Sequence, residues 1–196
     1  MPDPLQERFQ LSPLIRATLI SVYLALVVPL PLMAPPSLKR ILWMAAPTGL
    51  VLVVALLSEQ VEVDSNGIKV GHPVWCSWLL RRGWQLQWDE VRRLVPVGTS
   101  QGGTVYYLTT ADLQQRLLPQ RLGRFDRFLA VVQQRTGIST TSVKRLTPPW
   151  TYQLLFSLAI IMLVTESVVA LAVNSGWISI PEGYPGRSDS PADAPW

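Results

Sequence analysis

The chain has 196 residues, of which 48% are hydrophobic and 15% are charged, and its formal net charge at pH 7 is +4. The single cysteine excludes an intrachain disulfide, and one cysteine with one histidine cannot supply a four-ligand zinc site within one chain. Nucleic-acid binding needs a denser basic patch with interleaved aromatic side chains. We therefore expect neither a Cys/His zinc site nor a nucleic-acid partner.

Three apolar stretches are long enough to cross a membrane, because a spanning helix needs about 20 mostly apolar residues. The first is longer than the core of a signal peptide and follows little positive charge, which indicates a retained anchor. Pro47, inside the second, predicts a kink near residues 45 and 46 because proline removes a backbone hydrogen bond. The stretches are residues 14–33, 41–57 and 150–173.

These stretches divide the chain into five parts and set its orientation. Residues 59–149 hold 12 Lys and Arg against 7 Asp and Glu, a net of +5, whereas residues 174–196 have a net of −2. The positive-inside rule then places the central domain in the cytoplasm, with the tail in the periplasm or lumen of a bacterial inner membrane or thylakoid. The predicted parts are an N-terminal cytoplasmic segment (1–13), a transmembrane hairpin (14–58), the domain (59–149), a third transmembrane helix (150–174) and a disordered tail (175–196).

The central domain alternates apolar and polar residues in short runs, as half-buried strands do. Asn66-Gly67 is a strong hairpin-turn signal because both residues tolerate positive φ. After the strands, residues 122–135 carry apolar side chains at helical spacing, and Gly137 is a plausible terminator. The fold class is therefore an α+β membrane protein with a small antiparallel β-barrel or sandwich and a capping helix. The predicted strands are 59–64, 68–75, 84–88, 91–97, 105–109 and 115–118.

This succession resembles the pleckstrin-homology-like (PH-like) domain of short bacterial membrane proteins over residues 59 to about 138. The resemblance rests on Asn66-Gly67-Ile68, on Trp88-Asp89-Glu90-Val91 and on the final helix. It implies a strand pair, a corner, further strands and a C-terminal helix. The two-span hairpin ahead of the domain is also similar in layout to a photosystem I assembly-factor family of cyanobacteria and chloroplasts, from which the third span departs.

The residues that most often carry catalysis are sparse. His72 and Cys76 would lie on one face of the predicted strand but far apart, so we expect a packed cysteine and a surface histidine. Asp89 and Glu90 are adjacent, so their side chains diverge, and no second acidic pair is evident. We therefore expect no catalytic residues, no metal, no cofactor and no enzyme activity.

Basic residues of the domain are candidate contacts for membrane lipid or for a protein partner. We expect them to gather at the open end of the barrel, close to the membrane, where each attracts anionic headgroups by about 1 kcal/mol. The alternative is an ordinary solvated face whose charge sets the topology. The residues are Lys69, Arg81, Arg82, Arg92 and Arg93.

Glu166 is an acid within the third apolar stretch, where carboxylates are costly and face protein or water. It lies 16 residues beyond Trp150, roughly 24 Å along a helix. This places it near the far interface, level with Lys39 and Arg40 in the short connection between the first two spans. We predict an intramembrane pair of Glu166 with Lys39 or Arg40; snorkelling to the interface and contact with another membrane protein are the alternatives.

These observations favour a non-catalytic, membrane-anchored accessory or assembly factor. Its PH-like domain would dock a protein partner, a larger membrane complex, at the cytoplasmic face. One alternative is a sensor of anionic lipid surfaces that uses the basic residues. Another, narrower form is a photosystem assembly factor in a cyanobacterial thylakoid. An enzyme or a transporter lacks a supporting set of residues.

Overall fold

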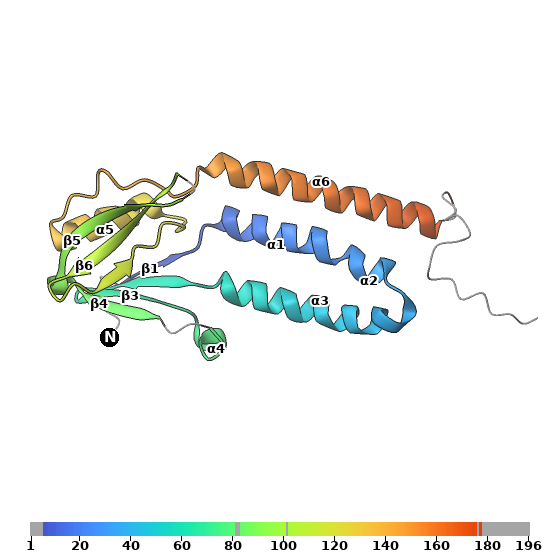
Figure 1. Cartoon of the computed structure of the whole chain (residues 1–196), viewed down its shortest axis with the longest axis horizontal. Helices are drawn as coiled ribbons and strands as arrows, with labels where there is room; N and C mark the ends of the chain where they lie inside the picture. Colours follow the sequence, from blue (N-terminus) through green and yellow to red (C-terminus); the bar gives the residue numbers. More distant parts are fainter. Residues whose placement is uncertain (1–5, 81–82, 101, 176, 178–196) are drawn as a thin grey trace, which may run out of the picture.

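The computed structural model describes residues 6–80, 83–100, 102–175 and 177. A domain of antiparallel strands lies at one end, and long apolar helices extend from it in one direction (Figure 1). The predicted α+β class is confirmed at this level: antiparallel sheets and three helices apolar enough to cross a membrane. Of the predicted disordered tail, all but Ser175 and Trp177 lies outside the described residues.

The apolar stretches form four helices. The chain runs outward along α1 and α2, returns along α3, and leaves the domain again along α6 (Figure 1). Helix α1 lies between α3 and α6, and its longest contact is with α6. The helices are α1 (Pro13–Val27), α2 (Pro29–Met33), α3 (Pro36–Leu56) and α6 (Pro149–Asn174).

The apolar helices are interrupted at a place that the sequence analysis did not predict. The first stretch is interrupted at Val28, where Pro29 starts a new helix, whereas α3 continues through Pro47. Beside Pro47, the hydroxyl of Tyr23 donates a hydrogen bond of 2.6 Å to the carbonyl oxygen of Ala46. This hydrogen bond joins α1 to α3 next to the proline, but the carbonyl oxygen that Pro47 leaves without its helical donor is that of Trp43, four residues earlier.

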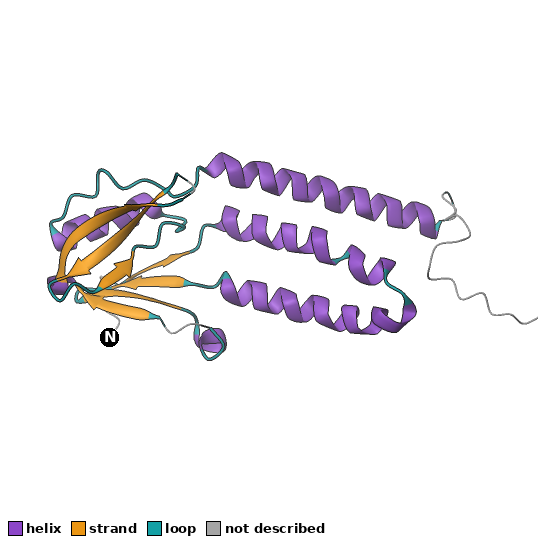
Figure 2. Ribbon diagram, viewed as in Figure 1, coloured by secondary structure: helices purple, strands orange, loops and turns teal. Residues whose placement is uncertain are grey.

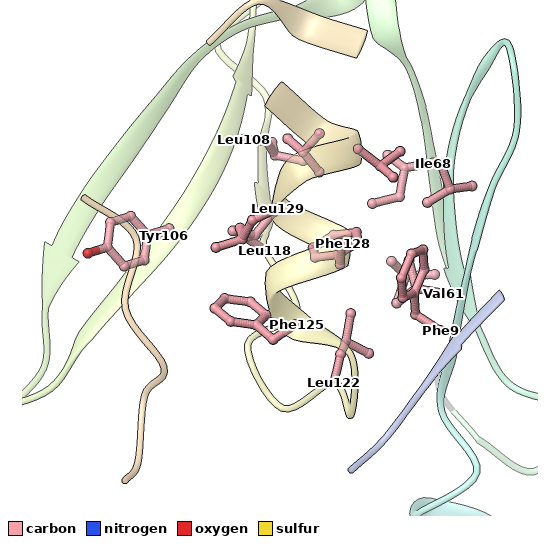
Figure 3. Close-up of a cluster of buried hydrophobic side chains, with 14 of the residues drawn as sticks. Phe9, Val61, Ile68, Tyr106, Leu108, Leu118, Leu122, Phe125, Phe128 and Leu129 are labelled. Carbon is pink, nitrogen blue, oxygen red and sulfur yellow. The ribbon is translucent and has the colours of Figure 1, made fainter. Parts of the chain in front are cut away.

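The domain has two antiparallel sheets with a helix between them (Figures 2 and 3). The predicted strands are found, but the second ends at Gly71 and is followed by a short helix, α4 (Val74–Ser77), where strand was expected. Helix α5 (Phe125–Thr136) ends at Gly137, whose φ of 70° makes it the predicted terminator. The first sheet contains β1 (Glu7–Gln10), β2 (Gln60–Val63), β3 (Gly67–Gly71) and β4 (Trp84–Gln87) in that order; the second contains β5 (Val91–Gly98), β6 (Thr104–Thr110) and β7 (Gln115–Leu117).

Strand β1 is an addition that the sequence analysis did not predict. It pairs with β2 across the whole of its length, so the chain from α1 to α3 is inserted between two neighbouring strands. The side chain of Phe9 is fully buried, and its ring meets that of Phe128 edge-on with 5.4 Å between centroids. The guanidinium of Arg124 lies 5.4 Å from the centroid of the Phe9 ring. Its Nη2 atom donates a hydrogen bond to the carbonyl oxygen of Arg8. The domain of antiparallel strands therefore includes the N-terminal segment.

An ion pair between β1 and α5 gives the domain a pH dependence. The carboxylate of Glu7 lies 2.6 Å from the guanidinium of Arg127, and this hydrogen bond lowers the pKa of Glu7 below its ordinary value of 4.5. The pair therefore stabilises the fold above pH 4.5, and this contribution disappears as the pH falls through the lowered pKa.

We expect Glu7→Gln to lower the thermal unfolding midpoint slightly at neutral pH, because exposed ion pairs contribute little. The difference from wild type should vanish once Glu7 is protonated. Circular dichroism melting curves of the purified protein over a pH series measure this. An equal difference at acidic pH would show that the ion pair is not its cause.

The turn between β2 and β3 forms for a reason other than the predicted one. Neither Asn66 nor Gly67 has a positive φ. The carboxylate of Asp64 instead accepts the backbone N–H groups of both residues, at 2.8 Å and 2.7 Å. A Cβ atom at Gly67 would overlap the carbonyl oxygen of Leu86 on β4. Glycine is needed here for the close approach of two strands, while the aspartate closes the turn.

Candidate functional site

The outer face of the first sheet is polar. Phe9, Val61 and Val70 point inward and are buried, so the alternate residues point outward. Directly paired residues share a face, and the register aligns Arg8 with Glu62, Glu62 with Lys69 and Lys69 with Gln85. We call this surface the polar outer face: Arg8, Gln60, Glu62, Lys69, Gln85 and Gln87.

The outer face of the second sheet is apolar along most of β5 and β6, and the register places the polar residues Arg93, Thr109 and Gln115 together at one end of it. Leu94 and Leu108 are paired and point toward the core, so their neighbours along the strands point outward. The register aligns Val95 with Tyr107 and Tyr107 with Leu117, and places Val97 opposite Val105. An antiparallel sheet with one solvated face is usually polar on that face. We call this surface the apolar outer face: Val95, Val97, Val105, Tyr107 and Leu117.

The apolar outer face is distinct from the packed side of the same sheet. On the packed side, Tyr106 lies beside the segment that follows α5 (Figure 3), and its hydroxyl donates a 2.7 Å hydrogen bond to the carbonyl oxygen of Ser142. On the outer side, Val97 and Leu117 are 42% and 47% exposed. Apolar side chains gathered on an exposed sheet face are typical of a protein interaction surface.

A hollow of about 330 Å³ lies at the edge of the polar outer face, beside the start of α4. The guanidinium of Arg8 and the carboxylate of Glu62 form an ion pair of 3.0 Å in its wall, with Lys69 as the paired neighbour of Glu62. The Nδ1 atom of His72 is buried there without a hydrogen-bond partner. The hollow has the volume of the smallest ligand sites, and its charges of both signs select no ligand class.

The described members of the predicted basic group do not come together near the helices. Lys69 lies on the first sheet, whereas Arg92 and Arg93 lie on the second. Strand β5 starts at the end of the domain opposite the helices (Figure 1), which carries Arg92 and Arg93 away from the expected position. Arg81 and Arg82 lie outside the described residues.

The predicted intramembrane pair is not formed either. Lys39 and Arg40 lie in α3 rather than in a connecting loop, and both are exposed. Helix α1 separates α3 from α6 (Figure 1), and among the described residues Glu166 has no ion pair with either of them. One carboxylate oxygen of Glu166, Oε2, is buried without a hydrogen-bond partner.

Glu166 belongs to the side of α6 that packs on α1. The two helices run in parallel, with the hydroxyl of Thr18 donating a 3.1 Å hydrogen bond to the carbonyl oxygen of Tyr152. Ala25 and Ala159 are buried further along, where small side chains let helices approach closely. The position of Glu166 on this side, rather than charge, explains its partial burial. The less exposed residues in this part of α6 are Tyr152, Phe156, Ala159, Leu163 and Glu166.

The remaining predicted residues have structural surroundings. Cys76 is buried, as predicted, with its Sγ 4.0 Å from the carbonyl oxygen of Ala55. His72 is half-buried rather than a surface residue. The carboxylate of Glu90 accepts the backbone N–H of Gln87 at 2.9 Å and so caps the short helix that starts at Trp88. In the described part of the chain, no three His, Cys, Asp or Glu residues are grouped as metal ligands would be.

Sequence reasoning missed the apolar outer face, although its signal was present. Val95 and Val97 alternate with the inward-facing Leu94, so β5 is apolar on both sides, and Tyr107 gives β6 the same character beside Leu108. The hollow could not be predicted in this way, because Arg8 reaches it only through the pairing of β1 with β2.

Comparison with known proteins finds one extended similarity. No protein-family model matches the chain, and no solved structure matches it significantly. A protein of the cyanobacterium Synechocystis sp., described as "Uncharacterized protein slr0269", is 40% identical over 179 residues. The alignment covers 88% of this chain and 88% of the relative, so it extends well beyond the central domain.

Proposed function

We propose that this chain, which belongs to the same family as the Synechocystis protein slr0269, is a non-catalytic accessory or assembly factor of a larger membrane complex. In this proposal α1 to α3 form a transmembrane hairpin and α6 a third span. The excess of positive charge in residues 59–149 supports a cytoplasmic domain and a periplasmic or lumenal tail. The cyanobacterial relative supports an inner-membrane or thylakoid location.

The fold that we propose for the domain is PH-like. A four-stranded and a three-stranded antiparallel sheet with a C-terminal helix between them support this proposal. The sequence resemblance over residues 59–138 points the same way. The connections between the domain and the helices are short. Leu11 forms a β-bridge with Leu122 of the domain, so Ser12 alone separates this bridge from α1, and three residues separate α3 from β2.

The apolar outer face is the observation that carries the proposed docking function. The strands of the second sheet are inclined to the long helices (Figure 2), so this face begins beside the helices, at the turn that joins β5 to β6, and continues away from them along the domain. A bilayer around the helices would reach at most the end of this face that holds Val97 and Val105, and would leave the rest of the face uncovered. A protein beside the helices can cover it with an apolar surface of its own, as an adjacent subunit of a membrane complex would.

Paired substitutions test the docking function. We expect Val97→Lys with Leu117→Lys to leave folding and membrane insertion intact, because more than two fifths of each side chain is already exposed to solvent. A charge in the centre of an apolar interface costs more than about 2 kcal/mol, a loss of affinity of more than tenfold. The partner recovered with the tagged protein from its native membrane in mild detergent, measured by quantitative mass spectrometry, should fall accordingly.

The matched control places the same two charges on the side of the polar outer face, as Gln10→Lys with Gln85→Lys, where both residues are exposed and Gln10 is paired with Gln60. We expect this variant to recover the partner as wild type does. Equal recovery by both variants would contradict docking on the apolar outer face. Recovery of wild type without stoichiometric partners would contradict the accessory function itself.

A role in photosystem assembly in the thylakoid is the narrower form of the proposal. It is supported by the similarity in layout to the photosystem I assembly-factor family and by the cyanobacterial relative. The mass-spectrometric experiment tests it too, because photosystem subunits should then dominate the recovered proteins. Recovery of a different membrane complex would agree with the accessory function and contradict the role in photosystem assembly.

A further inference from the structure

Helix α4 and the two residues that follow it, Trp78 and Leu79, expose an apolar surface that neither the domain nor the other helices cover; α4 below stands for this segment, residues 74–79. Val74 is 90% exposed, Trp75 51%, Trp78 80% and Leu79 53%. Cys76 is buried within the same turn, so one side of the segment is packed and the other is free. Two exposed indole rings are unusual on a solvated loop and indicate a surface that is covered in the working protein.

The position of α4 along the molecule identifies what covers it. Its buried side packs on the end of α3, where the Sγ of Cys76 lies 4.0 Å from the carbonyl oxygen of Ala55. Figure 1 shows α4 level with the domain-side ends of α1, α3 and α6. Exposed apolar residues of α3 continue to Leu56, its last residue, which is 53% exposed. The free surface of α4 thus continues the apolar surface of α3 at the depth where that helix would leave a bilayer.

The side-chain chemistry fits this depth. Tryptophan is enriched at the membrane–water interface because its ring is apolar and its N–H is polar. The N–H of Trp78 donates a 3.0 Å hydrogen bond to the carbonyl oxygen of Trp75, so this ring can enter an apolar layer without an unpaired donor. Trp150, 62% exposed, marks the same depth at the start of α6.

We propose that α4 is an interfacial anchor, which inserts Trp75 and Trp78 into the boundary between lipid headgroups and acyl chains. The lipid is the bilayer that the long helices span, so this inference rests on the membrane-spanning part of the proposed function. An apolar segment lying in the plane of the interface binds through its buried area. Together with the helices, the anchor fixes the rotation of the domain and directs the apolar outer face sideways toward a neighbouring protein.

Spin labels at single cysteines test the anchor in the full chain. Cys76, the one native cysteine, is replaced by Cys76→Ala, and Trp78→Cys is labelled with a nitroxide after reconstitution into vesicles of phosphatidylcholine and phosphatidylglycerol. We expect collisions with oxygen, which concentrates in lipid, to exceed collisions with a water-soluble nickel chelate. The oxygen-to-nickel ratio should be several-fold higher than at Leu113→Cys, a control of similar exposure, 71%, in the β6–β7 turn.

Leu52→Cys, within α3 and 45% exposed, separates the two ways in which the proposal can fail. A high ratio at position 52 with an aqueous ratio at position 78 would overturn the anchor and leave the membrane-spanning helices in place. An aqueous ratio at both positions would overturn the membrane-spanning helices and the anchor together.

Discussion

Truncating Phe9 to alanine is expected to lower the unfolding free energy of the extramembrane domain by about 3–5 kcal/mol. Phe9 is 1% exposed and packs on Phe128 at the centre of the core, although it precedes the first apolar helix by four residues. Small domains have about 5–15 kcal/mol in total, so much of the stability would disappear. Gln10→Ala, on the exposed side of the same strand, is the matched control and should have little effect. Chemical denaturation of the purified variants measures both.

The same strand determines which fragment can fold alone. We expect residues 59–147 by themselves to lack a cooperative unfolding transition, because β2 would lose its partner β1 and the core would lose Phe9. Joining residues 6–12 to residues 59–147 through a short glycine-rich linker should restore folding, since Gln10 pairs directly with Gln60. Cooperative unfolding of residues 59–147 alone would contradict the place of β1 in the domain.

The substitution Gly67→Ala, which adds a methyl group, is expected to lower the unfolding free energy almost as much as the truncation of Phe9. The Cβ of Gly67→Ala would overlap the carbonyl oxygen of Leu86, a backbone atom that cannot rotate away. The strands β3 and β4 must separate or shift, at a cost of about 3 kcal/mol. Gly98→Ala is the matched control, because a Cβ there meets no atom within 4 Å.

The measurement compares the melting temperatures of Gly67→Ala and Gly98→Ala with that of the wild-type protein. A drop at Gly67→Ala with little change at Gly98→Ala is the expected result. Equal melting temperatures would show that β4 does not lie as close to Gly67 as the structure places it.

The sequence predicted the strands and helix ends whose signal lies within a few neighbouring residues. The alternation of Trp84, Leu86 and Trp88 predicted a strand, and Gly137 predicted a helix end; both features are present. The alternation in residues 7–11, with Phe9 and Leu11 apolar, is the same signal in a shorter run. Its meaning as β1 depends on pairing with a strand about fifty residues away, beyond an apolar hairpin, and no local pattern contains that pairing.

The candidate site was harder to predict because it depends on register and on the order of helices. Lys69 and Arg92 look alike in the sequence, but their strands belong to different sheets. Glu166 and Arg40 were expected to be level along the helices, yet α1 and α2 lie between α6 and α3, the helices that carry them. The apolar outer face appears only when Tyr107 is aligned with Val95 and Leu117. In each case the sequence does not show which strands or helices lie next to one another.

Photo-crosslinking from the apolar outer face tests the proposed docking function most directly. A photoreactive phenylalanine analogue replaces Tyr107, whose ring it resembles in size, and a second variant carries it at Gln85 on the polar outer face. After irradiation in native membranes, we expect position 107 to crosslink to one defined membrane-complex protein and position 85 to give little product. Crosslinks to lipid alone at position 107, or none to protein, would contradict the proposal that this face docks a protein partner.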